Sequence, residues 1–208
     1  MDRVEKIGRA SARHELLAAF RRRGGLLTRR DIAAIGASSY TLQQLLKDHS
    51  VVRIAHGLYR LTDVSPFGTA AFSEACLAIR LGVVALQSAL AYYELITAIV
   101  DVVYLGVPRR VARARLDIPV TTVEMPPSRF RWGVENKRDA ANRFRIFSLE
   151  RTVCDAFAFP KVVTEDIAYQ GLRTYLERRD RNVELLLQHA DFTGTDHIID
   201  PVVKVLEA

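Results

Sequence analysis

Hydrophobic positions near the start of the chain recur at helical spacing in short stretches separated by turn signals. The first stretch, residues 12–23, ends at the helix-stopping pair Gly24-Gly25. The second begins at Thr28, which can form a capping-box arrangement with Asp31 three positions on, and it ends at Gly36. A third stretch comes directly after it, so the pattern predicts two short helices joined by a tight turn, a helix-turn-helix.

The third stretch begins at Ser38 or Ser39, either of which can cap a helix that runs to about Asp48. At about 100° per residue, its apolar positions share one face: Leu42, Leu45 and Leu46. The opposite face lacks carboxylates and consists of Tyr40, Gln43, Gln44 and Lys47. A merely solvated face would usually include Glu or Asp, whereas amides, hydroxyls and ammonium groups bind base edges and phosphates. We therefore predict a DNA-recognition helix, with Ser39 among its contacts.

Two short runs rich in branched and aromatic residues come next, and His56-Gly57 joins them, which predicts a β-hairpin. A hairpin directly after a recognition helix is a wing. We expect its apolar side chains to cover the helices: Val52, Ile54, Tyr59 and Leu61. We expect its polar side chains to be available to the DNA backbone: Arg53, His56 and Arg60. No second histidine or carboxylate accompanies His56, so we interpret it as a turn or phosphate contact rather than a metal ligand.

A second region, residues 66–208, lies beyond a linker at about 63–68. Its patterns predict a helix over 69–81, a short strand and a helix within 83–95, strands over 101–107, 119–125, 130–132 and 143–147, and then helices over 148–157, 164–179, 182–190 and 196–207. The predicted fold class is α+β: a winged helix-turn-helix in residues 1–65, then a mixed α/β domain with a small sheet and C-terminal helices. A domain as small as residues 1–65 buries only roughly 60% of its unfolded surface, so we expect it to pack against the second region.

Charge divides the chain at the same place. Residues 1–65 carry 12 Lys/Arg against 6 Asp/Glu, whereas residues 66–208 carry 18 of each, so the net charge of +6 lies in the first third. A basic domain followed by a neutral one suggests different partners, the basic one meeting a polyanion. Within the second region, residues 101–145 are basic. Their arginines are candidates for a partner contact, a secondary DNA contact or a solvated loop: Arg109, Arg110, Arg113 and Arg115.

The sequence argues against a membrane protein, a secreted protein and an enzyme. No apolar stretch approaches the roughly 20 residues of a membrane span, and the first residues lack the apolar run of a signal peptide. Cys76 and Cys154, 78 positions apart, form neither a disulfide framework nor a metal-ligand spacing. Nucleotide-binding glycine loops, HExxH, GxSxG and CxxC do not occur. We expect a cytoplasmic binding protein without metal, cofactor or catalysis.

Several phrases of the sequence resemble the AbiEi antitoxin family, the DNA-binding half of AbiE-type toxin–antitoxin pairs. They are, in order, RIAHGLYRL in the wing, ALQSALAYYEL followed by VVYLGVPR, RWGVEN, and FRIFSLERTVCDAF. The resemblance covers roughly residues 12–160, and the order of the phrases is more specific than any single one. One departure is Asp48-His49-Ser50, where the family suggests a glycine in the turn between helix and wing.

The resemblance implies a repressor of its own operon whose second domain, residues 66–208, counters a nucleotidyltransferase-type toxin. Its DNA partner is then a double-stranded operator, which we expect two protomers to occupy as an inverted repeat. Within SLERTVCDAF, Ser148 caps a helix on which Arg151 and Asp155 are four positions apart. That ion pair either holds the helix against a sheet or contacts the partner directly.

Two other classes of function remain open from the sequence. A winged-helix regulator that senses a small molecule, without a toxin partner, would need a pocket with convergent polar groups in the second region. A nucleic-acid-modifying enzyme would need an acidic cluster able to hold Mg²⁺.

Overall fold

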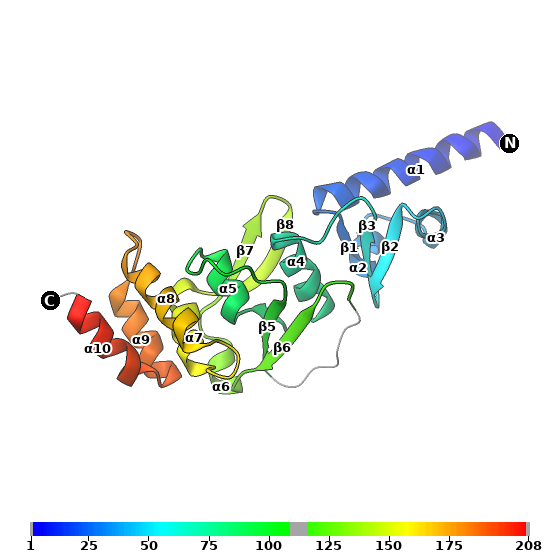
Figure 1. The fold of residues 1–208 in the computed structure, drawn as a ribbon. Helices are drawn as coiled ribbons and strands as arrows, with labels where there is room; N and C mark the ends of the chain where they lie inside the picture. The colour runs from blue at the N-terminus through cyan, green and yellow to red at the C-terminus, as the bar shows by residue number, and fades with distance from the viewer. Residues whose placement is uncertain (1, 109–115, 207–208) are drawn as a thin grey trace. The chain divides into compact units, whose positions relative to one another are not determined.

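The computed structural model describes residues 2–108 and 116–206, which divide into two compact units (Figure 1). Unit 1 is built from residues up to Arg80 together with 116–118 and 138–144. Unit 2 is built from residues 81–108, 119–137 and 145–206. The compact unit that holds the N-terminal domain therefore continues past residue 65.

Unit 1 contains the winged helix-turn-helix that the sequence predicts. Its elements are α1 (Asp2–Arg22), β1 (Leu26–Thr28), α2 (Arg29–Ala34), α3 (Ser39–Lys47), β2 (Val51–Ala55), β3 (Leu58–Leu61) and α4 (Thr69–Ala78). The strands form an antiparallel sheet in the order β1-β3-β2. Helices α2 and α3 are the helix-turn-helix, and the β2–β3 hairpin is the wing (Figure 1).

Local sequence signals set the ends of the two short helices. Asp31 N donates to Thr28 Oγ1 at 3.2 Å and Thr28 N donates to Asp31 Oδ2 at 2.9 Å, which is the predicted capping box at the start of α2. Ser38, rather than Ser39, caps α3, because its Oγ accepts a hydrogen bond from Thr41 N at 3.1 Å. Helix α3 therefore begins at a defined residue.

The wing sheet is buried on both faces. The face toward α1, α2 and α3 carries Leu27, Val51, Tyr59 and Leu61. The other face carries Leu26, Val52, Ile54 and Leu58, which pack with Ala78 of α4. The expectation that Val52 and Ile54 cover the three helices was wrong. Side chains alternate along a strand, so these two residues lie opposite Val51, and α4 covers them.

The turn between α3 and the wing has a backbone conformation that usually belongs to glycine. His49 has φ of 59°, in the left-handed region. Ser50 N donates to Asp48 Oδ1 at 3.1 Å, and Thr62 Oγ1 donates to the carbonyl oxygen of His49 at 2.6 Å. These bonds hold the turn, so the wing forms although the glycine suggested by the resemblance is replaced by histidine.

Unit 2 is a mixed sheet with helices. Its elements are β4 (Val83–Val84), α5 (Leu86–Tyr92), β5 (Val103–Val107), β6 (Val120–Glu124), α6 (Pro127–Phe130), β7 (Val134–Asp139), β8 (Asn142–Phe147), α7 (Leu149–Ala158), α8 (Glu165–Leu176), α9 (Val183–Thr193) and α10 (Asp196–Leu206). Residues 138–144, which are the end of β7, the turn after it and the start of β8, are counted with unit 1. The strand order is β6-β5-β4-β8-β7. Strand β4 pairs antiparallel with β5 and parallel with β8. The small sheet and the C-terminal helices confirm the predicted α+β class.

Helix α7 lies at the centre of unit 2, where it contacts α5, α8 and α9 (Figure 1). Its Val153 and Cys154 are fully buried in one core with Leu172 and Tyr175 of α8 and Leu186 of α9. The phrase SLERTVCDAF is therefore the segment around which the C-terminal helices pack.

Two parts of the predicted sheet were wrong. Residues 130–132 are not a strand, because Pro126 and Pro127 begin the short helix α6, which ends at Phe130. Strand β7 was missed, because its residues VENKRD contain one apolar side chain and lie at the edge of the sheet, half exposed or exposed.

Candidate nucleic-acid interface

Helix α3 exposes the face that the sequence assigns to DNA recognition. Leu42 and Leu45 on the opposite face are buried in unit 1. The exposed residues are Ser39, Tyr40, Gln43, Gln44 and Lys47. The Tyr40 side chain is 52% exposed although it is large and partly apolar. The helix therefore presents amide, hydroxyl and ammonium groups without a carboxylate, a composition suited to base edges and phosphates.

A groove of about 230 Å³ runs beside this face, between α2 and α3. Arg29, Ser39 and Gln43 line it. Arg29 is exposed, and its backbone N–H donates to the carbonyl oxygen of Gly57 in the wing turn at 2.7 Å. The bond places the first residue of α2 beside the wing. Sequence reasoning missed Arg29, although an arginine opening the first helix of a helix-turn-helix is a signal that could have found it.

The wing turn brings Arg53 and His56 together. The Arg53 guanidinium lies 3.1 Å from His56 Nδ1, and its Nε donates to the carbonyl oxygen of Ala55 at 3.3 Å. Both Arg53 and His56 are exposed. A β-bulge between Arg53 and Ala55 interrupts the pairing of the hairpin at this point. Arg53 and His56, which the sequence predicts as phosphate contacts, therefore lie together at the tip of the wing.

Arg60 does not share that exposure, and its expected availability to the DNA backbone was wrong. Its side chain is 12% exposed, and its Nη1 lies 2.6 Å from Oε2 of Glu74 on α4, a residue with no exposed side chain. A second, weaker contact joins Arg60 Nη2 to Asp117 Oδ2 at 3.4 Å. Arg60 alternates with Tyr59 and Leu61, so it points to the α4 side of the sheet.

The end of the recognition helix is tied to α1. Arg13 on α1 forms an ion pair with Asp48, and its Nη2 donates to Ser50 Oγ at 3.0 Å. Hydrogen bonds from Ser50 and Arg13 hold the pKa of Asp48 below its usual value, so the carboxylate stays charged. These contacts join α1 to the turn that follows α3.

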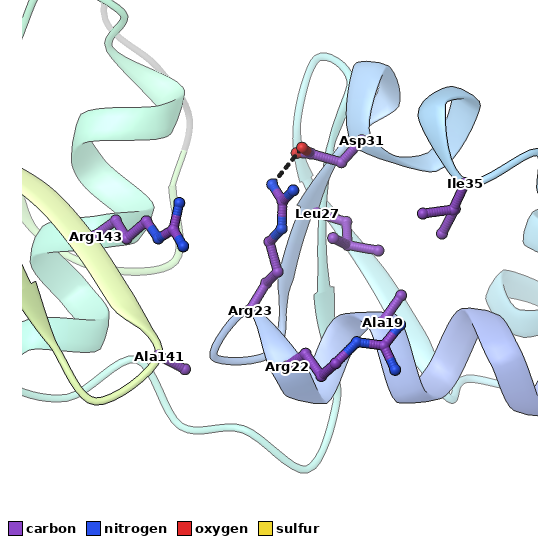
Figure 2. A pocket seen from close by; sticks show the side chains of 8 residues that line it. All are labelled: Ala19, Arg22, Arg23, Leu27, Asp31, Ile35, Ala141 and Arg143. Atoms are coloured by element: carbon purple, nitrogen blue, oxygen red, sulfur yellow. Dashed lines mark hydrogen bonds and ion pairs between the residues drawn. The ribbon is translucent and has the colours of Figure 1, made fainter.

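A second group of arginines lines a hollow of about 280 Å³ in unit 1 (Figure 2). We call it the arginine hollow, and its lining residues are Ala19, Arg22, Arg23, Leu27, Asp31, Ile35, Ala141 and Arg143. Asp31 and Ile35 line this hollow, whereas Arg29 and Ala33 line the groove beside α3, so the two concavities flank α2. Sequence spacing could not find the hollow, because Arg143 comes from the distant strand β8.

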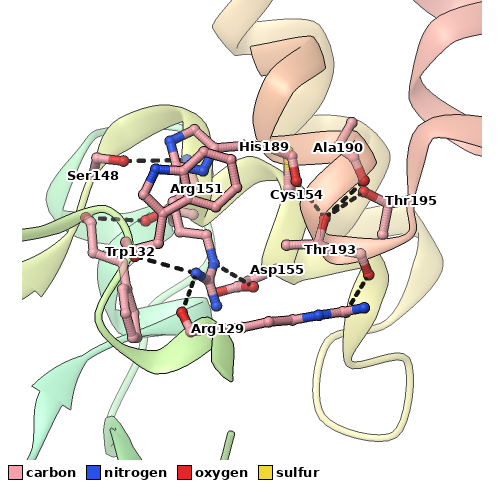
Figure 3. A network of polar contacts seen from close by, with 12 residues as sticks. Arg129, Trp132, Ser148, Arg151, Cys154, Asp155, His189, Ala190, Thr193 and Thr195 are labelled. Carbon is pink, nitrogen blue, oxygen red and sulfur yellow. Dashed lines mark hydrogen bonds and ion pairs between the residues drawn. The ribbon is translucent and has the colours of Figure 1, made fainter. Parts of the chain in front are cut away.

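The predicted ion pair of α7 is present and buried. Arg151 Nε lies 2.8 Å from Asp155 Oδ1, and both side chains are almost fully buried. Arg151 Nη1 also donates to the carbonyl oxygens of Arg129 and Trp132, at 2.9 and 3.2 Å (Figure 3). This geometry favours the interpretation in which the pair holds α7 against neighbouring segments, because a buried guanidinium is not available to a partner.

Four other arginines that the sequence predicts as contacts lie outside the described residues: Arg109, Arg110, Arg113 and Arg115.

Membrane spans and metal clusters are both missing from the described part of the chain. Among residues 2–108 and 116–206, no helix is long and apolar enough to cross a membrane. Over the same two ranges, no group of three or more His, Cys, Asp or Glu residues is placed to hold a metal ion.

The helix-turn-helix, the exposed carboxylate-free face of α3 and the basic wing tip together form a winged helix, an arrangement typical of DNA-binding proteins. Residues 14–62 match a family described as a transcriptional regulator, AbiEi antitoxin. The match covers the helix-turn-helix and the wing phrase RIAHGLYRL, and it confirms the resemblance over this segment. No curated protein matches the chain.

Proposed function

We propose that the protein is the antitoxin and autorepressor of a toxin–antitoxin operon, and that it acts in the cytoplasm by binding rather than by catalysis. The observation that carries the DNA-binding part is the exposed face of α3 with Arg29 and the wing tip beside it. The antitoxin part is supported by the family match of residues 14–62. In this proposal residues 1–65 supply DNA recognition and residues 66–208 counter a nucleotidyltransferase-type toxin.

The DNA-binding part is tested with single substitutions in the full chain. Gln43→Ala and Gln44→Ala should weaken operator binding by about 1–3 kcal/mol and relax base preference, because glutamine pairs with adenine through two hydrogen bonds. Arg53→Ala should weaken all DNA sequences alike, because it contacts phosphate. The matched control is Gln188→Ala, an exposed glutamine on α9 in unit 2. Wild-type affinity and preference in both α3 variants would reject the recognition helix.

The operator should be an inverted repeat occupied by two protomers. A single winged helix contacts a short half-site, and one domain of this size buries too little surface for high specificity. Footprinting of the operator together with the mass of the complex measures the stoichiometry. One protomer on an asymmetric site would contradict this part of the proposal.

The antitoxin part is tested by co-expressing the full chain with the nucleotidyltransferase-type toxin. The double variant Gln43→Ala/Gln44→Ala should lose repression and still rescue growth, because α3 belongs to unit 1. Reversal of Arg109, Arg110, Arg113 and Arg115 to Glu should weaken rescue, because these arginines are the proposed toxin contacts, and circular dichroism checks that the variant is folded. If the α3 variants lost rescue and the arginine reversals retained it, the assignment of DNA binding and toxin neutralisation to separate domains would be wrong.

A small-molecule sensor is the second candidate, because unit 2 has a hollow of about 520 Å³. Arg129, Arg151 and Asp155 line it together with Phe157 and Phe159. Among the described residues, Asp155 Oδ2 is buried and has no hydrogen-bond partner. Convergent polar groups with aromatic walls are typical of ligand sites. This candidate requires that a metabolite releases the operator from the wild type and that the protein fails to rescue cells from the toxin.

A further inference from the structure

The arginine hollow holds more positive charge than its own carboxylate can neutralise. Arg23 Nη1 lies 2.5 Å from Asp31 Oδ1. The other oxygen, Asp31 Oδ2, already accepts hydrogen bonds from Thr28 N at 2.9 Å and Thr28 Oγ1 at 2.6 Å. Burial raises the pKa of Asp31, but the bonds from Thr28 and Arg23 outweigh it and leave the pKa below its usual value. Asp31 is therefore a charged, fully engaged partner of Arg23.

The other two guanidinium groups of the hollow have no such partner. Within the described residues, neither Arg22 nor Arg143 forms a hydrogen bond or an ion pair through its side chain. In the view of Figure 2, Arg23 lies between Arg143 on one side and Arg22 on the other. Like charges that line one concavity repel each other, and an anion bound among them reverses the sign of that interaction.

The apolar lining strengthens the attraction for an anion. The rest of the wall is apolar and consists of Ala19, Leu27, Ile35 and Ala141, of which Leu27 is fully buried. Apolar walls lower the local dielectric constant, so a charge–charge interaction is stronger there than in open water. Guanidinium groups also present N–H pairs whose geometry matches the oxygens of a phosphate.

We propose that the arginine hollow binds a phosphate group, with Arg22, Arg23 and Arg143 as its donors. The inference rests on the proposed DNA-binding function in one respect: the phosphate comes either from the operator backbone beside the recognised bases or from a free nucleotide. In the first case the DNA contact of unit 1 includes the segment 138–144, which contributes Arg143. In the second case the hollow is a nucleotide site next to the helix-turn-helix.

The experiment compares Arg22→Ala, Arg143→Ala and the double variant with Arg21→Ala in the full chain. Arg21 is the matched control, because it is an exposed arginine on the same turn of α1 that does not line the hollow. Operator affinity is measured against salt concentration, and thermal stability is measured with sodium pyrophosphate at constant ionic strength. Each lost phosphate contact should lower the slope of log K against log salt by about 0.9.

A slope that falls in the Arg22 and Arg143 variants, but not in the Arg21 variant, supports binding of the DNA backbone. Stabilisation of the wild type by pyrophosphate, lost in the double variant and kept in Arg21→Ala, supports binding of free phosphate. Unchanged slopes together with no pyrophosphate effect overturn the proposal. If the wild type binds no DNA at all, the proposed function fails, and the pyrophosphate measurement still decides whether the hollow is a phosphate site.

Discussion

Arg60→Ala should destabilise unit 1 severely, and it should do so without acting as a DNA-contact mutation. The Arg60 side chain is 12% exposed and Glu74 is completely buried, with 2.6 Å between Arg60 Nη1 and Glu74 Oε2. Removing one partner of a buried ion pair costs about 3–5 kcal/mol, because the remaining charge stays buried without compensation. Asp117 is 69% exposed and lies 3.4 Å from Arg60 Nη2, so its contact adds little to this loss of unfolding free energy.

The pH dependence of stability shows that Glu74 is the buried charge left without a partner in Arg60→Ala. Burial raises the pKa of Glu74, against the lowering effect of Arg60. Loss of Arg60 should raise that pKa further. A raised folded-state pKa means that the folded protein binds the proton more tightly than the unfolded chain, so stability falls as pH rises through it. The stability gap between wild type and Arg60→Ala should therefore widen from pH 5 to pH 8, and Arg60→Ala/Glu74→Gln should show a smaller gap.

Chemical denaturation followed by circular dichroism measures the loss, and hydrogen exchange over residues 51–80 localises it to unit 1. Trp132 is the single tryptophan and lies in unit 2, so its fluorescence provides an internal control. Operator binding by the folded fraction should stay close to that of the wild type. A loss below about 1 kcal/mol, accompanied by weaker DNA binding, would refute the argument and restore Arg60 as a phosphate contact.

Three further predictions concern single residues. Ser38→Ala removes the cap on α3 and should cost about 1 kcal/mol of stability in denaturation; an unchanged stability would show that Thr41 N is satisfied in another way. His49→Val should cost about 1–2 kcal/mol because a β-branched residue is strained at positive φ, whereas His49→Gly should fold normally; equal stabilities would contradict the left-handed turn. Burial, and secondarily Arg151, lowers the pKa of His189 to about 4, so stability should fall by up to roughly 3 kcal/mol between pH 6.5 and 4. In His189→Gln this loss should be absent, and a pH profile identical to that of the wild type would contradict it.

The sequence predicted the elements whose signals are local. The capping box of Thr28 and Asp31, the serine cap at Ser38 or Ser39 and the Gly57 turn depend on residues within a few positions of one another, and the structure has all three, with Ser38 as the cap. The exposed face of α3 was predictable for the same reason, since helical periodicity alone separates it from Leu42 and Leu45.

The parts that could not be predicted depend on contacts between distant segments. Arg60 has the same alternation as a solvent-facing wing residue, and only the position of Glu74 on α4 shows that it is buried. Arg143 joins Arg22 and Arg23 across more than a hundred residues of sequence. Strand β7 has no apolar alternation, because an edge strand with exposed faces does not need one.

The packing of α4 on the back of the wing sheet limits how this DNA-binding module can be transplanted. A chimaera that ends at residue 65 would carry α3 and the wing, but it would leave Leu26, Ile54 and Leu58 without the helix that covers them. Such a fragment should expose an apolar face of the sheet, and it should therefore precipitate or self-associate. A fragment that folds by itself must therefore extend at least to Arg80. Helix α4 lies outside the family match of residues 14–62, but it is a structural part of the winged helix.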